Sequence, residues 1–138
     1  MNKLLQQIAE LPYISTGTPL TTTDIANYQS TLLQHGLPLM PKDYQKFLLS
    51  YNGILSEGNI IFGLSAIGHF LYDLLGENAY ADNPTPQNLL LLGATETIYI
   101  GWQKSKNLYQ MIDKSNFMVL HEFDNLSDAI KCVLKIND

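Results

Sequence analysis

Residues 37–63 read LPLMPKDYQKFLLSYNGILSEGNIIFG, and within this stretch the hydrophobic pattern changes from that of a helix to that of a strand. Large apolar residues first recur at helical spacing, which predicts a helix that begins at Pro41 and buries an aromatic-rich face. The members of this face are Tyr44, Phe47, Leu48 and Tyr51. Asn52 and Gly53 can end the helix because both tolerate a left-handed backbone. The apolar run at residues 59–63 then has the length of a buried strand.

Two further helices are expected on the N-terminal side of this stretch. Apolar residues recur at helical spacing over residues 4–11, and Pro12 ends that run. A second helix begins at Asp24, whose negative charge suits a helix N-terminus, and ends at Gly36. Together with the helix that follows Pro41, they place three helices before the first buried strand.

The C-terminal half is expected to consist mainly of strands. Short apolar or alternating runs occur at residues 89–92, 97–102, 108–112 and 117–120. The last three runs are separated by short polar turns, which is typical of an antiparallel meander. A final helix buries Leu126, Ile130 and Val133, with Asp124 or Asn125 as its N-cap.

The order of helices, sheet and helix predicts a single α+β domain over residues 1–138, in which helices pack on a largely antiparallel or mixed sheet. A chain of 138 residues suits one domain of this kind. Helices and strands do not alternate, so a doubly wound parallel fold is not expected. Residues 65–87 have the least regular pattern, with room for one short helix around residues 70–75.

The charged residues argue against several classes of partner. The chain has 13 acidic and 8 basic residues, giving a net charge of −5, and every basic residue is a lysine. Proteins that bind nucleic acid or anionic membranes cluster Lys and Arg to neutralise phosphates, whereas these lysines are scattered. We therefore expect neither nucleic acid nor a membrane as the partner.

The single cysteine and the N-terminal residues bear on compartment and cofactors. Because Cys132 is the single cysteine, an intramolecular disulfide framework and a zinc site built from cysteines are both excluded. The N-terminal residues lack the continuous apolar core of a signal peptide, and no apolar run approaches the ~20 residues that cross a bilayer. We expect a soluble, cytoplasmic protein that uses no metal and no cofactor.

Catalytic motifs are not evident in the chain. It contains no glycine-rich phosphate loop, nucleophile elbow or HExxH pattern. His69 and Asp73 would share one face of a helix and could form an acid–base pair, which is the basis of one alternative, a small hydrolase. A solvated or locally hydrogen-bonded histidine explains the same pattern, so we do not expect an enzyme.

Acidic and aromatic residues in the expected loops and strands are the candidate contacts with a partner. The acidic ones are Glu57, Asp73, Glu77 and Asp82, and the aromatic ones are Tyr80 and Tyr99. An acidic cluster attracts a cationic partner, and tyrosine is enriched at the centres of protein interfaces. The alternative is that these acids form an ordinary solvated surface.

Residues 37–53 resemble the signature of the SUKH superfamily, in which a proline-led turn and a helix with spaced aromatic residues lead through Asn-Gly into a strand. The matching residues are Pro38, Pro41, Tyr44, Phe47, Asn52 and Gly53. The resemblance extends over roughly residues 20–136. It implies an α+β domain with a mixed or antiparallel sheet, and it carries over no catalytic residue.

The SUKH superfamily includes yeast cell-wall assembly regulators and many bacterial immunity proteins. The resemblance implies a cytoplasmic immunity protein that binds a cognate toxin domain, often a nuclease or deaminase in the bacterial relatives, and neutralises it by association. The acidic balance of the chain predicts that this toxin has a basic surface. The alternative is a non-catalytic regulatory or scaffold module related to the cell-wall assembly regulators.

Overall fold

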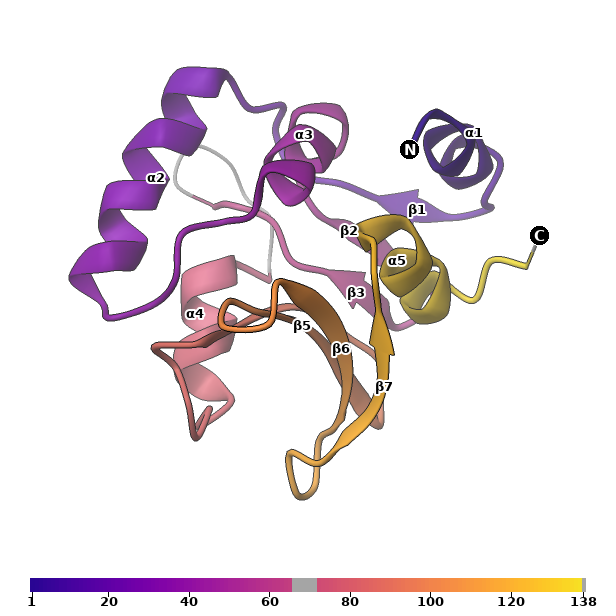
Figure 1. Ribbon diagram of the computed structural model, residues 1–138. Coiled ribbons are helices and arrows are strands. Elements are labelled where there is room, and N and C mark those ends of the chain that lie inside the picture. Colours follow the sequence, from indigo (N-terminus) through magenta and orange to yellow (C-terminus); the bar gives the residue numbers. More distant parts are fainter. Residues whose placement is uncertain (66–71, 138) are drawn as a thin grey trace.

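In the computed structural model, which describes residues 1–65 and 72–137, seven strands form one sheet whose order follows the chain (Figure 1). The strands are β1 (Ile14–Ser15), β2 (Ile54–Ser56), β3 (Asn59–Ile61), β4 (Leu89–Ala94), β5 (Ile98–Gln103), β6 (Leu108–Asp113) and β7 (Val119–Phe123). Every pair of neighbouring strands is antiparallel. Within the described ranges, the parallel pairing is limited to an isolated bridge between Gly63 and Asp73. The predicted α+β class with a largely antiparallel sheet is therefore confirmed.

The described part of the chain contains five helices, several of which begin at local signals in the sequence. They are α1 (Asn2–Ala9), α2 (Thr22–Gln34), α3 (Lys42–Ser50), α4 (Leu74–Tyr80) and α5 (Leu126–Leu134). Thr21 and Asp24 form a capping box at the start of α2, in which each side chain accepts the backbone N–H of the other residue. Helix α3 follows Pro41, and Asn125 rather than Asp124 caps α5.

Two predicted elements are displaced along the chain. Helix α4 begins at Leu74, later than the short helix expected around residues 70–75, because the Asp73 side chain caps it. The last strand covers residues 119–123 instead of 117–120. Phe117 has a φ of 58° and donates its N–H to the Asp113 carbonyl at 2.8 Å, so it closes the turn between β6 and β7.

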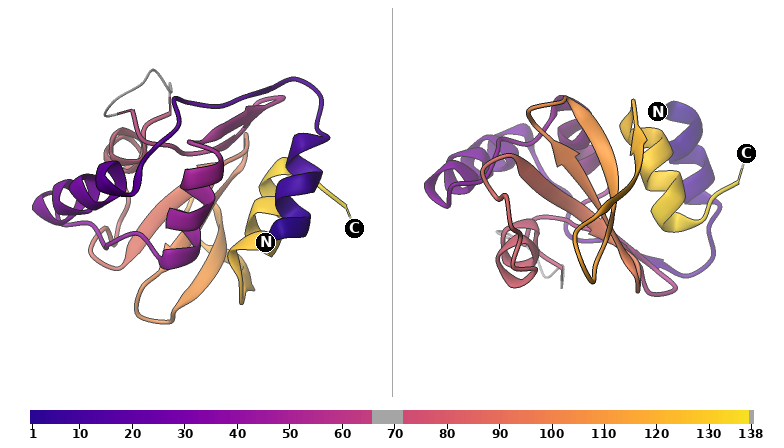
Figure 2. Two further views of the ribbon diagram at one scale, coloured as in Figure 1. Left: turned by 90° about the horizontal axis from the view of Figure 1, so that it is seen from above. Right: turned by 60° about the horizontal axis from the view of Figure 1, so that its bottom comes forward.

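Helices α5 and α4 lie on opposite sides of the sheet (Figures 1 and 2). Cys132 of α5 places its Sγ 3.6 Å from the Met111 Sδ of β6. Met111 pairs with Ile100 of β5, so both side chains lie on the face that α5 covers. Tyr99, the neighbour of Ile100, points to the other face, which is the face beside α4. Strand β4 is buried along its whole length because both of its faces are covered. Helix α1 lies next to α5 in all views.

The residues of the SUKH-like stretch form part of the core. Tyr44 and Phe47 of α3 are fully buried, and the Tyr44 hydroxyl donates to the Phe62 carbonyl at 2.5 Å. Pro38 is buried in the loop before α3, and Pro41 is the N-cap residue of that helix. These side chains join α3 to the segment that follows β3.

Asn52 and Gly53 carry the chain from α3 into β2. The Asn52 side chain is 2% exposed, and its amide donates to the carbonyls of Thr18 and Leu64 at 2.8 and 2.9 Å. Its Oδ1 accepts the Leu64 N–H at 2.7 Å. Gly53 has a φ of 74°, which a residue without a side chain adopts at little cost.

Candidate functional site

Three of the six predicted partner contacts line one hollow beside helix α4. Glu77 and Tyr80 come from α4, and Tyr99 comes from β5. The other lining residues are Ile60, Tyr72, Ala94 and Lys114. The volume is about 350 Å³. We call this site the Glu77 hollow; it combines three tyrosines, one carboxylate and one ammonium group.

The start of helix α4 is fixed by the Asp73 carboxylate. It accepts hydrogen bonds from the N–H groups of Gly76 and Ser65 at 3.2 and 3.0 Å. It also accepts the Tyr28 hydroxyl of α2 at 2.8 Å. Asp73 is therefore engaged as a helix cap and joins α2 to α4, although its negative charge still acts on Glu77.

Asn78 fixes the other side of α4 to the sheet. Its buried amide donates to the Leu91 carbonyl at 2.9 Å and accepts the Leu91 N–H at 2.8 Å. A neighbouring strand would make the same two bonds, but β3 pairs only with Gly93 and Ala94 of β4. Asn78 thus extends the hydrogen bonding of this edge of β4, and the adjacent residue Glu77 lines the hollow.

The ionisable groups of the Glu77 hollow influence one another. Burial raises the pKa of the Glu77 carboxyl above its usual value, the positive charge of Lys114 opposes this rise, and Asp73 adds to it. The Lys114 Nζ lies 5.1 Å from the centre of the Tyr99 ring, within the range of a cation–π contact. Burial, followed by the nearby Glu77 and Tyr80, raises the pKa of the Tyr99 hydroxyl.

The remaining predicted contacts lie outside the hollow. Glu57 occupies the turn between β2 and β3 with a φ of 51°, and Asp82 follows α4 with a φ of 55°. Neither residue lines the hollow. The acidic residues therefore do not converge on one patch as a group. His69, the proposed partner of Asp73 in the hydrolase alternative, lies outside the described residues.

The sequence did not indicate Tyr72 and Lys114 as site residues. Lys114 directly follows β6, and its N–H donates to the Thr97 carbonyl at 3.0 Å, which brings it beside Tyr99. The pairing of Asp113 with Ile98 could have suggested this proximity had the register of β5 and β6 been known. A lysine in a polar turn otherwise gives no signal of a binding role.

A larger hollow, of about 530 Å³, lies between the start of α3 and the β5–β6 hairpin. Leu39 and Trp102 line it and also line an adjoining hollow of about 440 Å³. Two of its polar residues, Gln29 and Gln45, are occupied in hydrogen bonds with the Met40 main chain. These bonds hold the loop before α3 against α2, so part of the polar lining is structural.

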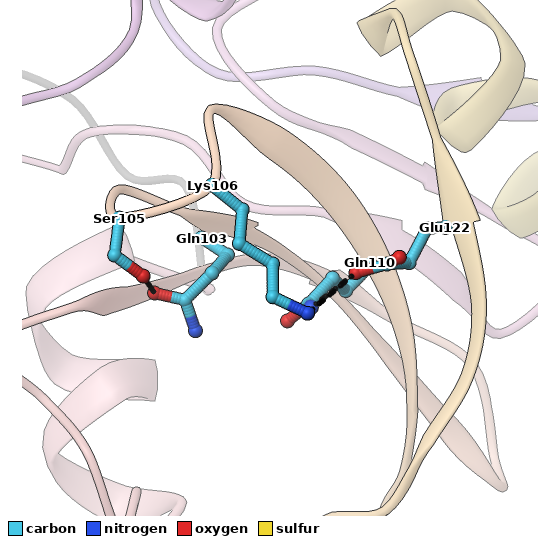
Figure 3. Close-up of polar contacts among 5 residues, drawn as sticks. All are labelled: Gln103, Ser105, Lys106, Gln110 and Glu122. Atoms are coloured by element: carbon cyan, nitrogen blue, oxygen red, sulfur yellow. Dashed lines mark hydrogen bonds and ion pairs between the residues drawn. The ribbon is translucent and has the colours of Figure 1, made fainter.

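A further group of polar side chains lies on strands β6 and β7 and on the turn before β6 (Figure 3). The Gln110 amide donates to Glu122 at 2.9 Å, and the Lys106 ammonium lies 3.4 Å from the same carboxylate oxygen. The hydrogen bond from Gln110 is the main reason why the pKa of the Glu122 carboxyl falls below its usual value. These contacts satisfy the Glu122 carboxylate and favour its charged form, so the group supports pairing of β6 with β7.

Residues 1–65 and 72–137 contain no group of three or more His, Cys, Asp or Glu side chains placed to hold a metal ion. No helix of these ranges has both the length and the apolar character needed to cross a membrane.

No model of a known protein family matches the chain, and no similar curated protein was found. The resemblance of residues 37–53 to the SUKH superfamily therefore stays a prediction from the sequence.

Proposed function

We propose that this protein is a cytoplasmic immunity protein that binds a cognate bacterial toxin domain with a basic surface and neutralises it by association, without catalysis. The observation that supports this proposal best is the Glu77 hollow, where Tyr80 is 88% exposed next to a partly buried carboxylate. The SUKH-like stretch and the net charge of −5 agree with it.

The side chains of the hollow have the properties of an interface centre. Tyrosine offers a large apolar surface together with a hydroxyl, and such residues often contribute most of the binding energy when a partner covers them. The excess negative charge of the chain speeds the encounter with a cationic partner. Binding of this kind requires no catalytic group, and it can block a toxin by covering its substrate site.

The test is co-expression with any toxin domain that a neighbouring gene is found to encode. We expect the protein to restore growth and to co-purify with the toxin. Tyr80→Ala should weaken the complex by roughly tenfold or more, as expected for an interface tyrosine. Tyr13→Ala is the matched control, because Tyr13 is 90% exposed but lies between α1 and β1.

Charge steering is tested on the same complex. The association rate should fall as salt is added, because salt screens attraction between the acidic protein and a basic toxin. Absence of both rescue and complex formation, or recovery of a housekeeping protein in place of a toxin, would contradict the immunity function.

A further inference from the structure

The Glu77 hollow already holds a cation that belongs to the protein itself. The Lys114 ammonium lies 5.1 Å from the Tyr99 ring centre, and its charge stabilises the ionised form of the Glu77 carboxyl. One aromatic face and one carboxylate thus act together on a positively charged group. This combination is how proteins commonly hold lysine and arginine side chains.

The hollow has room and aromatic surface beyond what Lys114 uses. Its volume is about 350 Å³ with the Lys114 side chain in place. Tyr72 and Tyr80 add two further aromatic rings to its lining. The charges of Glu77 and Asp73 interact with each other, whereas Lys114 is the cation that acts on Glu77. A basic group that took the place of Lys114 would therefore meet the same carboxylate and the same aromatic ring.

We propose that the Glu77 hollow binds a basic side chain, an arginine or lysine of the partner, which takes the place of Lys114 against Tyr99 and Glu77. This inference rests on the proposed function, since it specifies which group of the partner enters the hollow. Lys114 stands in the turn after β6 on a long, flexible stem, so its ammonium can move into solvent without a change in the sheet.

Because Lys114 and the incoming group compete for the same place, substitutions in the hollow should change the affinity for a basic group in opposite directions. Lys114→Met removes the internal competitor and should tighten binding of a basic group by about two- to fivefold. Glu77→Gln and Tyr99→Leu remove the two groups that hold the cation, and each should weaken binding by about the same factor. A hollow that bound apolar or acidic groups would not show this pattern.

The experiment uses two short peptides and the full chain. Acetyl-Gly-Arg-Gly-amide is titrated into the protein, and the ring resonances of Tyr72, Tyr80 and Tyr99 are followed by NMR. The matched ligand is acetyl-Gly-citrulline-Gly-amide, which has nearly the same shape but no charge. Lys46→Met and Glu10→Gln are the matched protein controls, because they change the net charge equally at exposed positions outside the hollow.

We expect saturable shifts with the arginine peptide, much weaker shifts with the citrulline peptide, and tighter binding by Lys114→Met than by Lys46→Met. Equal binding of the two peptides, weaker arginine binding by Lys114→Met, or no saturable shift in any variant would overturn the inference. A toxin complex that forms normally but is unchanged by Glu77→Gln would also overturn it, while leaving the immunity function intact.

Discussion

Two buried asparagines take the place of main-chain groups in this protein. The Asn78 amide pairs with both main-chain groups of Leu91, as a strand would. The Asn52 amide does the same with Leu64 and also reaches the Thr18 carbonyl. Buried backbone groups must be hydrogen-bonded, so Asn78 satisfies an edge of β4 that β3 does not cover, and Asn52 satisfies the segment that follows β3.

Asn52→Ala is expected to destabilise the protein strongly. The substitution leaves the Leu64 N–H and two carbonyls without their partner, and each buried polar group left unsatisfied costs about 1–3 kcal/mol. We expect a loss of about 2–4 kcal/mol in the free energy of unfolding, measured in urea. Asn27→Ala, at an exposed position of α2, should stay within about 0.5 kcal/mol of the parent. Similar values for the two variants would show that the Asn52 bonds contribute little.

The sequence predicted Asn52 as a residue that ends a helix and as part of the SUKH-like stretch, but not as a buried hydrogen-bonding residue. Its amide partners are Thr18 and Leu64, which lie 34 and 12 residues away along the chain. No local pattern reports such distant partners. The role of Asn52 therefore follows from the packing of three segments, which only the folded chain shows.

At the level of helices and strands, local signals located most of the elements but not all. The negative charge of Asp24 at the start of α2 and the alternating residues of β5 predicted their elements from the sequence alone. Strand β1 has only two residues and exists because it pairs with β2. Helix α4 is held by the tertiary contacts of Asp73 and Asn78, so its position could not be read from periodicity.

Gly93→Ala is expected to disturb the pairing of β3 with β4. A methyl group at Gly93 would lie 2.6 Å from the Ile60 carbonyl oxygen and 3.2 Å from the Ile61 Cδ1. Relief of this overlap requires the two strands to separate, which should cost about 1–3 kcal/mol in the free energy of unfolding. Denaturant unfolding of the variant measures this cost.

Gly76→Ala is the matched control within α4. A methyl group there would meet only the Asp73 Oδ2, at an ordinary 3.8 Å. Alanine restricts the unfolded chain and favours the helix, so this variant should be more stable by about 0.5–1 kcal/mol. A shift in the same direction for both variants would contradict the proposed close approach at Gly93.

At the scale of the whole molecule, buried tyrosines should make the protein sensitive to alkali. Burial is the largest cause that raises the pKa of Tyr28, Tyr44 and Tyr109 above the usual value of 10.0. Below pH 10 these hydroxyls are protonated in both states, and their contribution to stability is fully present. Above pH 10 the unfolded chain releases protons that the folded chain retains, so the free energy of unfolding should fall as pH rises.

Each such tyrosine should add about 1.4 kcal/mol per pH unit to this fall. Urea unfolding between pH 8 and 11.5 measures it, and Tyr109→Phe should make the slope shallower by about that amount. Tyr13→Phe controls for removal of a hydroxyl as such, since this ring is 90% exposed. An unchanged slope in Tyr109→Phe would show that its burial does not oppose ionisation.

The candidate site could be predicted in part. The sequence indicated that acids and tyrosines lie on loops beside strands, and Glu77, Tyr80 and Tyr99 do line one hollow. It could not show that Glu57 and Asp82 lie elsewhere, because their positions depend on turns with left-handed backbone. Convergence of side chains from α4 and β5 depends on how α4 packs on the sheet, a property of the whole fold.

The strands lie in the sheet in the same order as they occur along the chain, and this order constrains how the sheet forms during folding. Most neighbouring strands close only a short loop, so β4 to β7 can form as successive hairpins with little loss of chain entropy. The connection from β3 to β4 is much longer, since it runs from residue 62 to residue 88. Closure of this loop joins the N-terminal hairpin to the C-terminal meander. Among the pairings of consecutive strands from β2 to β7, it loses the most chain entropy.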